Sequence, residues 1–440
     1  MNTKIKNVKA REVLDSRGNP TVEVDIDLEC GAKARATCPS GASTGVHEAV
    51  ELRDGDRTRF NGKGVRSAIG IINREIASLI HGMDATDQAA VDEKLIVGDG
   101  TVNKSRFGAN STVAVSMAVA RAASSAEGKH LWEYLGGPKA NLLPVPMMNV
   151  LNGGVHANWQ GPDFQEYMIV PFGAADFSEA LRWGAEVYQA LKKVLTNEGF
   201  NTAVGDEGGF VINASSNDIP LDLILKAIEK AGYNGGNEVA IALDPASSAF
   251  YEDGYYLLGS KRKSGRSNQA IANEAARLSS LEMIERYSKL IERYPIISIE
   301  DGLAEDDWDG WKHLTRELGS KIELVGDDIF VTHVKRIGRG IEEKTANAVL
   351  IKPNQIGTIT ETIAAIKLAQ NNGWGVELSH RSGETVDSFI ADLTVATGAG
   401  HIKAGAPCRG ERVEKYNQLL RIEESLGSMA RFAGRDAIIR

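Results

Sequence analysis

Cysteines are scarce in this sequence of 440 residues, which has only Cys30, Cys38 and Cys408 and no CxxC pair. So few thiols, and an odd number of them, predict reduced cysteines rather than a disulfide framework or a zinc site. No apolar stretch reaches the roughly 20 residues needed to cross a bilayer, so we expect no membrane span. The net charge of -9 argues against nucleic-acid and anionic-membrane partners. Together these absences predict a cytoplasmic protein.

Several common ligand-binding signatures are also missing. The chain has no Walker phosphate-binding motif, no GxGxxG after an apolar run and no HExxH. P-loop nucleotide binding, dinucleotide binding and zinc-protease chemistry are therefore disfavoured. A small anionic substrate is still compatible with the acidic composition, because one site can be locally positive.

The chain divides at a cluster of glycine and proline between residues 135 and 146. Before it, mixed signals predict an α+β domain over residues 1–137, and residues 21–28 alternate like a half-buried strand. After it, residues 143–440 alternate short apolar runs with helical stretches, which predicts a parallel sheet. So many units favour a (β/α)8 barrel, with a doubly wound sheet as the alternative. Residues 251–268 interrupt this rhythm and are interpreted as a polar surface insertion.

Polar residues follow the apolar runs of the second domain. Six runs end in Asp244, Glu300-Asp301, Asp327-Asp328, Lys352, Ser379-His380-Arg381-Ser382 and Lys403. After the insertion, successive runs lie about 25 residues apart, the size of one strand plus one helix. The carboxyl ends of parallel barrel strands open onto one face, where active sites lie. We therefore expect these side chains to converge on one mouth.

Three of these side chains, Asp244, Glu300 and Asp327, offer hard oxygen ligands from successive runs. Magnesium suits such a site, because it binds few protein oxygens and leaves room for water and substrate. A single acid at a strand end is usually a cap or turn residue. Three in a row, followed by Lys352, favour chemistry instead. Nearby metal cations would lower the pKa of that lysine and make it available as a base.

Two further glutamates lie upstream of this row. Glu166 precedes an apolar run, and Glu207 lies in a glycine-rich loop, where each alone would be a solvated acid. Together they predict an acid pair whose repulsion keeps one proton bound at neutral pH. Arg381 and Ser382 offer a two-donor clamp suited to a phosphate.

Several motifs, in order along nearly the whole chain, resemble those of the enolase family, the phosphopyruvate hydratases of glycolysis. They are Asp15-Ser16-Arg17-Gly18-Asn19-Pro20-Thr21-Val22-Glu23, Pro39-Ser40-Gly41-Ala42-Ser43-Thr44-Gly45, Glu300-Asp301, Gly326-Asp327-Asp328, Lys352-Pro353-Asn354-Gln355-Ile356-Gly357 and Ser379-His380-Arg381-Ser382-Gly383-Glu384-Thr385. A lysine base with magnesium is the arrangement typical of that superfamily. The resemblance implies a modified (β/α)8 TIM-type barrel with an N-terminal α+β cap domain. It also implies reversible dehydration of 2-phospho-D-glycerate to phosphoenolpyruvate.

The same resemblance implies roles for individual residues. The first of two magnesium ions would be held by Asp244, Glu300 and Asp327. Ser43 would ligate the second ion, which binds with the substrate. Lys352 would remove the C2 proton, and Glu207, supported by Glu166, would protonate the departing hydroxyl.

The resemblance further implies a substrate pocket formed by His156, Gln165, Ser43, His380, Arg381, Ser382, Lys403, Glu300 and Asp327. In it, Arg381 and Ser382 would hold the phosphate, and Lys403 would meet the carboxylate. A homodimer is expected, with an octamer as the alternative, and the composition does not decide between them. A secondary pool at the cell surface or outside the cell is also left open.

Two other functions are weighed against this one. A related acid-sugar dehydratase would place a Lys-x-Lys pair at a strand end, whereas Lys4-Ile5-Lys6 lies at the start of the chain and Lys261-Arg262-Lys263 in the insertion. A non-catalytic structural or adhesive protein on the same fold would have lost site residues. No such loss is found, and the enolase-type lyase is therefore favoured.

Overall fold

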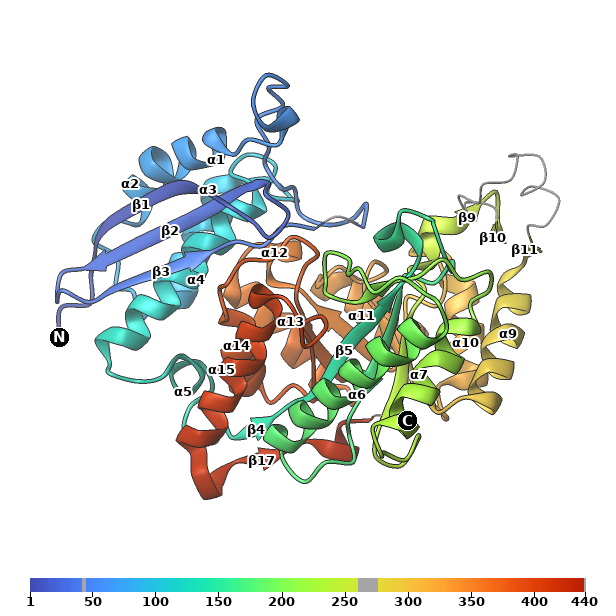
Figure 1. Ribbon diagram of the computed structural model, residues 1–440. Helices are drawn as coiled ribbons and strands as arrows, with labels where there is room; N and C mark the ends of the chain where they lie inside the picture. Colours follow the sequence, from blue (N-terminus) through green and yellow to red (C-terminus); the bar gives the residue numbers. More distant parts are fainter. Residues whose placement is uncertain (42–44, 260–275, 439–440) are drawn as a thin grey trace.

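The computed structural model of the protein describes residues 1–41, 45–259 and 276–438. The cap domain, blue to cyan in Figure 1, is built on an antiparallel sheet of β1 (Ile5–Leu14), β2 (Pro20–Leu28) and β3 (Lys33–Thr37). In β2 the apolar side chains of Val22, Val24 and Ile26 are fully buried, which confirms the predicted half-buried strand. The remaining described elements of this domain are a 3-10 turn (Phe60–Gly62), α1 (Arg66–Ile71), a π-helical turn (Ile72–Ile76), α2 (Ala77–Ile80), α3 (Gln88–Asp99), α4 (Ala109–Ala126) and α5 (Leu131–Gly136).

Helix α4 joins the cap domain to the rest of the molecule. It contacts β2 and β3 on one side and α12 (Pro353–Ile356) and α13 (Ile359–Asn371) on the other. Nearly all of its residues are buried, as its alanine-rich, almost charge-free sequence requires. From this helix the half-buried Arg121 reaches the buried side chain of Asp387 in the second domain, with N–O distances of 2.6 and 2.7 Å.

The second domain is a closed barrel, which confirms the predicted fold. Among the described residues, the eight strands that form the barrel are β5 (Val145–Asn152), β6 (Glu166–Val170), β8 (Ala240–Asp244), β12 (Ile296–Glu300), β13 (Glu323–Gly326), β14 (Ala348–Ile351), β15 (Gly375–Ser379) and β16 (His401–Lys403). Pairing of β16 with β5 closes the ring, and the short β7 (Phe210–Val211) adds to the end of β5. All the apolar runs identified in the sequence are strands.

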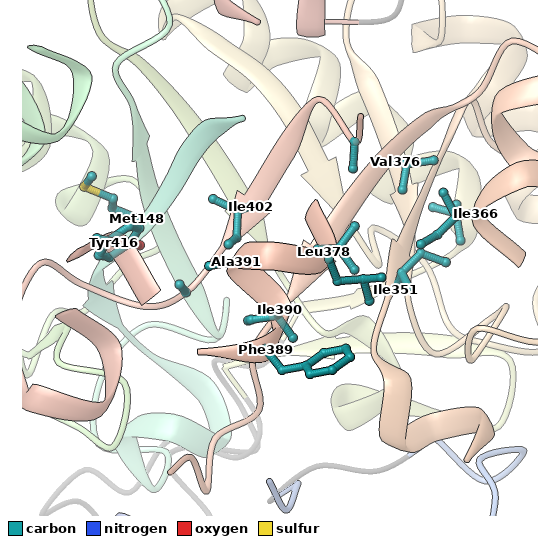
Figure 2. Close-up of a cluster of buried hydrophobic side chains, with 14 of the residues drawn as sticks. Met148, Ile351, Ile366, Val376, Leu378, Phe389, Ile390, Ala391, Ile402 and Tyr416 are labelled. Carbon is teal, nitrogen blue, oxygen red and sulfur yellow. The ribbon is translucent and has the colours of Figure 1, made fainter. Parts of the chain in front are cut away.

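Helices cover the outside of the barrel (Figure 1). Besides α12 and α13 they are α6 (Phe177–Asn197), α7 (Ile219–Lys230), α9 (Ser280–Arg293), α10 (Trp308–Leu318), α11 (Val334–Glu343), α14 (Phe389–Thr397) and α15 (Gly410–Leu426). Figure 2 shows the core between strands and helices, where Ile351, Val376 and Leu378 gather with residues of α13 and α14. None of the helices that the structure describes is long and apolar enough to cross a membrane.

One strand, β6, runs against the direction of its neighbours. It forms antiparallel pairs with both β5 and β8, whereas all other pairs of neighbouring barrel strands are parallel. As a result Glu166, the first residue of β6, lies beside Asp244, the last residue of β8. The reversal also sends α6 back toward the same mouth, so that the segment carrying Glu207 follows it there. Both upstream glutamates thus reach the face formed by the strand ends.

The predicted polar insertion is only partly a surface feature. Its described part forms β9 (Tyr251–Glu252) and β10 (Tyr255–Leu258). In a small antiparallel sheet, β10 pairs with β9 on one side and with β11 (Ala276–Leu278) on the other. Tyr256 is fully buried, and its hydroxyl donates to Asp307 at 2.7 Å. The prediction of a polar surface insertion is therefore wrong for Tyr256 and Leu258 of β10, which are buried. Residues 260–275, including Lys261-Arg262-Lys263, lie outside the described residues.

Candidate active site

The strand ends border a pocket that contains most of the side chains predicted from sequence. Its lining includes His156, Gln165, Glu166, Glu207, Asp244, Asp327, Lys352, His380, Arg381, Ser382 and Lys403. Glu300 does not line the pocket itself, but it forms an ion pair with Lys403, which does line it. Ser43 lies outside the described residues.

Lys403 lies among three buried carboxylates. Its Nζ atom is 2.5 Å from Glu300 Oε2 and 3.2 Å from both Asp244 Oδ2 and Glu166 Oε2. Burial alone would lower the pKa of Lys403, but these carboxylates raise it well above the ordinary value. The side chain is therefore a fixed cation, since a buried ammonium is tolerated only when it is paired. An anionic ligand in the pocket would meet a positive charge here.

The three predicted metal ligands lie at the ends of adjacent strands: Asp244 and Glu300 are the last residues of β8 and β12, and Asp327 directly follows β13. Burial and the neighbouring charges of Asp244 and Asp327 raise the pKa of Glu300 well above its ordinary value. A divalent cation would relieve this repulsion, and an all-oxygen donor set suits magnesium. The residues therefore fit the ion that the sequence predicts.

Asp301 is a further acid that the prediction did not single out. Asp301, Asp327 and Asp328 each offer a carboxylate oxygen within 4.8 Å of the others. The two oxygens of Asp301 also accept the backbone N–H groups of Asp327 and Asp328 at 2.9 and 3.0 Å. Asp301 thus fixes the turn after β13 and, with it, the orientation of Asp327.

Lys352 follows β14 and contacts Asp327 through an ion pair. Gln355 donates to the other oxygen of Asp327 at 2.8 Å, and Thr332 donates to Gln355 at 2.7 Å. Burial would lower the pKa of Lys352, but Asp327 and Glu300 raise it above its ordinary value. With Asp327 fully charged, Lys352 is thus protonated, whereas a proton-abstracting base must be neutral.

The two upstream glutamates lie on either side of His156. His156 Nδ1 is 3.7 Å from Glu166 Oε1, and its Nε2 is 3.9 Å from Glu207 Oε1. Burial and the charge of Glu207 raise the pKa of Glu166 well above its ordinary value. For Glu207, His380 and His156 outweigh burial and lower the pKa. The two acids therefore lie close to one histidine with pKa values shifted in opposite directions, which favours the proton on Glu166 over Glu207.

Arg381 makes a two-pronged contact with Glu48, at 2.9 and 3.2 Å, and donates to Asn354 at 3.1 Å. The guanidinium is buried and therefore pre-oriented. The two terminal nitrogens of Arg381 thus bind the carboxylate of Glu48. Glu48 therefore occupies the position in which Arg381 would bind an anionic group of a ligand. The neighbouring Ser382 is also buried and lines the pocket.

Several side chains that orient this site escaped the sequence prediction. They are Glu48, Asn149, Asp301, Thr332, Gln355 and Arg412. Gln355 belongs to a motif noted in the sequence, and Asp301 follows a predicted ligand, so these two carried a local signal. Arg412 and Asn149 carried none, because their partners lie far away in the chain.

Family comparisons agree with this geometry along the whole chain. Residues 5–135 match the model described as "Enolase, N-terminal domain", and residues 140–440 match "Enolase, C-terminal TIM barrel domain". "Enolase 2" of Pseudomonas syringae pv. tomato is 61% identical over 440 residues, covering 100% of both chains. "Enolase 2" of Methanospirillum hungatei JF-1 is 60% identical over 437 residues, covering 99% of each. The chain belongs to the enolase family.

Proposed function

We propose that this chain is a phosphopyruvate hydratase, which converts 2-phospho-D-glycerate into phosphoenolpyruvate and water, and the reverse. The observation that carries the proposal is the composition of one pocket. It combines a buried lysine, a carboxylate cluster, an acid pair and an Arg–Ser clamp. The lysine would meet the C2 proton, the acid pair the 3-hydroxyl, and the Arg–Ser clamp the phosphate. The carboxylate cluster would hold magnesium, which together with Lys403 offers positive charge to the substrate carboxylate.

In the first step, neutral Lys352 takes the proton from C2, and the electron pair of the C–H bond moves toward the substrate carboxylate. Asp244, Glu300 and Asp327 would hold magnesium, which would supply positive charge that lowers the pKa of Lys352 and stabilises the second negative charge forming on the substrate. Lys403 adds a fixed positive charge on the same side. Its three carboxylate contacts support this role.

In the second step, the C2–C3 double bond forms as the C3–O bond breaks. Glu207 delivers a proton to the departing hydroxyl, so that water leaves. Glu166 is the reservoir of this proton, which its raised pKa supports. His156 lies between the two acids and lines their side of the pocket.

Arg381 and Ser382 hold the phosphate, and binding exchanges the Glu48 carboxylate for a phosphate oxygen pair. Arg381→Lys tests this role, because a lysine keeps the charge but cannot grip two oxygens in one plane. We expect a KM for 2-phosphoglycerate at least about tenfold higher, with a smaller change in kcat. An unchanged KM would assign the phosphate to other residues.

The overall proposal is tested by following the absorbance of the enol phosphate product, with and without EDTA. We expect product from 2-phosphoglycerate, its loss with EDTA and its return with added magnesium. Lys352→Ala should abolish exchange of the C2 proton with solvent. Glu207→Gln should retain exchange but block dehydration. Absence of magnesium-dependent product would refute the proposal, and equal loss of exchange and dehydration in Glu207→Gln would refute separate roles.

We further propose two magnesium ions per site, with Ser43 ligating the second, a homodimeric assembly and a cytoplasmic location. The resemblance to the family supports these points. Isothermal titration with and without substrate counts the ions, and light scattering at several concentrations measures the assembly. We also propose residues 1–137 and 143–440 as the domain division, to be tested by limited proteolysis.

A further inference from the structure

Arg412, near the start of α15, is a fully buried cation beside the pocket. Its two terminal nitrogens carry four N–H groups, and four acceptors surround them. Nη1 lies 2.6 Å from His380 Nδ1 and 2.5 Å from the Arg381 carbonyl oxygen. Nη2 lies 3.0 Å from the Asp206 carbonyl oxygen and 2.6 Å from that of Ser382. The side chain thus joins the Glu207 segment to the end of β15.

The contact with His380 fixes where the imidazole carries its proton. An arginine side chain only donates hydrogen bonds and stays protonated, so Nδ1 must present a lone pair to it. A neutral imidazole then carries its single proton on Nε2. That nitrogen is 3.4 Å from Glu207 Oε2, a long approach at the limit of a hydrogen bond. It is a donor directed into the pocket, beside the Glu207 carboxylate.

We propose that Arg412 is a positioning residue that keeps His380 neutral, with its proton on Nε2 and directed at Glu207. This inference rests on the proposed function, in which Glu207 is the acid of the second step. A fixed neutral donor stabilises the Glu207 carboxylate once its proton has left. A histidine cation would instead bind that carboxylate so strongly that its reprotonation became unfavourable. Protonation of His380 would therefore impair the acid pair.

The electrostatics around His380 agree with this geometry. The charged groups that face the ring are Glu207 from the glycine-rich segment, Arg412 from α15 and Glu384 from the segment after β15. Burial and the Arg412 charge together outweigh Glu207 and lower the pKa of His380 to about 4. Removal of the Arg412 charge leaves the two carboxylates facing the ring. The pKa should then rise toward the ordinary value of about 6.5.

The test uses the whole chain labelled with 15N-histidine. Two-dimensional spectra of the ring nitrogens report which one carries the proton, and a His380→Gln spectrum identifies the signals of His380. In the unaltered protein we expect a bare Nδ1 and a protonated Nε2 from neutral pH down to about pH 5. In Arg412→Gln, His380 should titrate near neutral pH. A proton on Nδ1 of the unaltered protein at neutral pH would overturn the proposal, whether or not the chain dehydrates 2-phosphoglycerate.

Kinetics then separate positioning from general stability. Arg412→Gln should lose about tenfold to a hundredfold in kcat at neutral pH, and the loss should grow as pH falls. Arg412→Lys, which keeps a cation beside the ring, should recover part of kcat and the neutral His380. Leu419→Ala is the matched control, because it removes a fully buried, uncharged side chain about two turns further along the same helix. It should lower stability but leave the pH profile unchanged.

Two outcomes contradict the positioning role. One is a loss in Arg412→Gln by the same factor at every pH, with an unaltered His380 titration. The other is a shifted pH profile in Leu419→Ala. If Arg412→Gln does not fold, the spectrum of the unaltered protein and the Arg412→Lys profile still decide.

Discussion

A glutamate inside the barrel should make the stability of this chain depend on pH. Glu377 lies on β15, is 2% exposed, and is in register with His401 on β16. Within the described residues its Oε1 atom has no hydrogen-bond partner. Burial raises the pKa of Glu377 from 4.5 to about 7, although Lys403 and His401 oppose the shift. The folded chain therefore keeps a proton that the unfolded chain loses at lower pH.

The sign and size of the effect follow from this difference. Between the unfolded pKa of 4.5 and the folded pKa of about 7, the folded state binds more protons, so its stability falls as pH rises. At about 1.4 kcal/mol per pKa unit, the cost at pH 8 is at most about 3 kcal/mol. Glu377→Gln removes the charge. It should raise the free energy of unfolding by about 1 to 3 kcal/mol at pH 8 and by much less at pH 4.5.

Urea unfolding at pH 4.5 and pH 8, at one protein concentration, measures this difference. Glu317→Gln on the exposed face of α10 is the control, and it should change stability little at either pH. Because other buried groups also titrate, the decisive quantity is the difference between the two variants at each pH. A Glu377→Gln effect that is equal at both values, or a larger loss of stability at pH 8, would refute the reasoning.

Three further predictions concern buried polar contacts. Asp387→Asn breaks the pair with Arg121, whose charge outweighs burial and lowers the pKa of Asp387. The stabilisation by the pair is complete above the unfolded pKa of 3.8 and is lost as pH falls through the lower folded pKa. The variant should therefore unfold at a cost about 3 kcal/mol smaller at pH 7, and urea unfolding should show this difference shrink steadily below pH 3.8. Thr332→Val removes the hydrogen bonds to Gln355 and to the Lys352 amide. Chemical denaturation should show a free energy of unfolding about 1 to 3 kcal/mol lower, and a dehydration assay should show a lower kcat. Tyr256→Phe should cost about 1 to 2 kcal/mol in thermal unfolding, because Asp307 and the Ala304 amide lose a partner.

The barrel strands could be predicted from sequence because each is a short apolar run that ends at or beside a polar residue of the pocket. The reversed direction of β6 could not be predicted in this way. Its residues Glu166–Val170 are all buried, and a fully buried run is compatible with a parallel or an antiparallel strand. Glu377 lay inside a run treated as apolar, so a charge in the barrel was overlooked. Arg412 acts on His380 across 32 positions, and a single sequence offers no periodicity that links them. Local patterns therefore located the site, but not the contacts that orient it.

The reversed strand β6 also changes where this barrel can accept new sequence. In a regular barrel, the connection leading into a strand lies at the end away from the active site, and changes there affect stability rather than catalysis. Here the connection into β6, residues 153–165, lies at the catalytic mouth and carries His156 and Gln165. The connection out of β6, residues 171–176, lies at the opposite end. Peptides grafted into 171–176 should leave turnover intact, whereas equal lengths placed in 153–165 would reshape the substrate entrance.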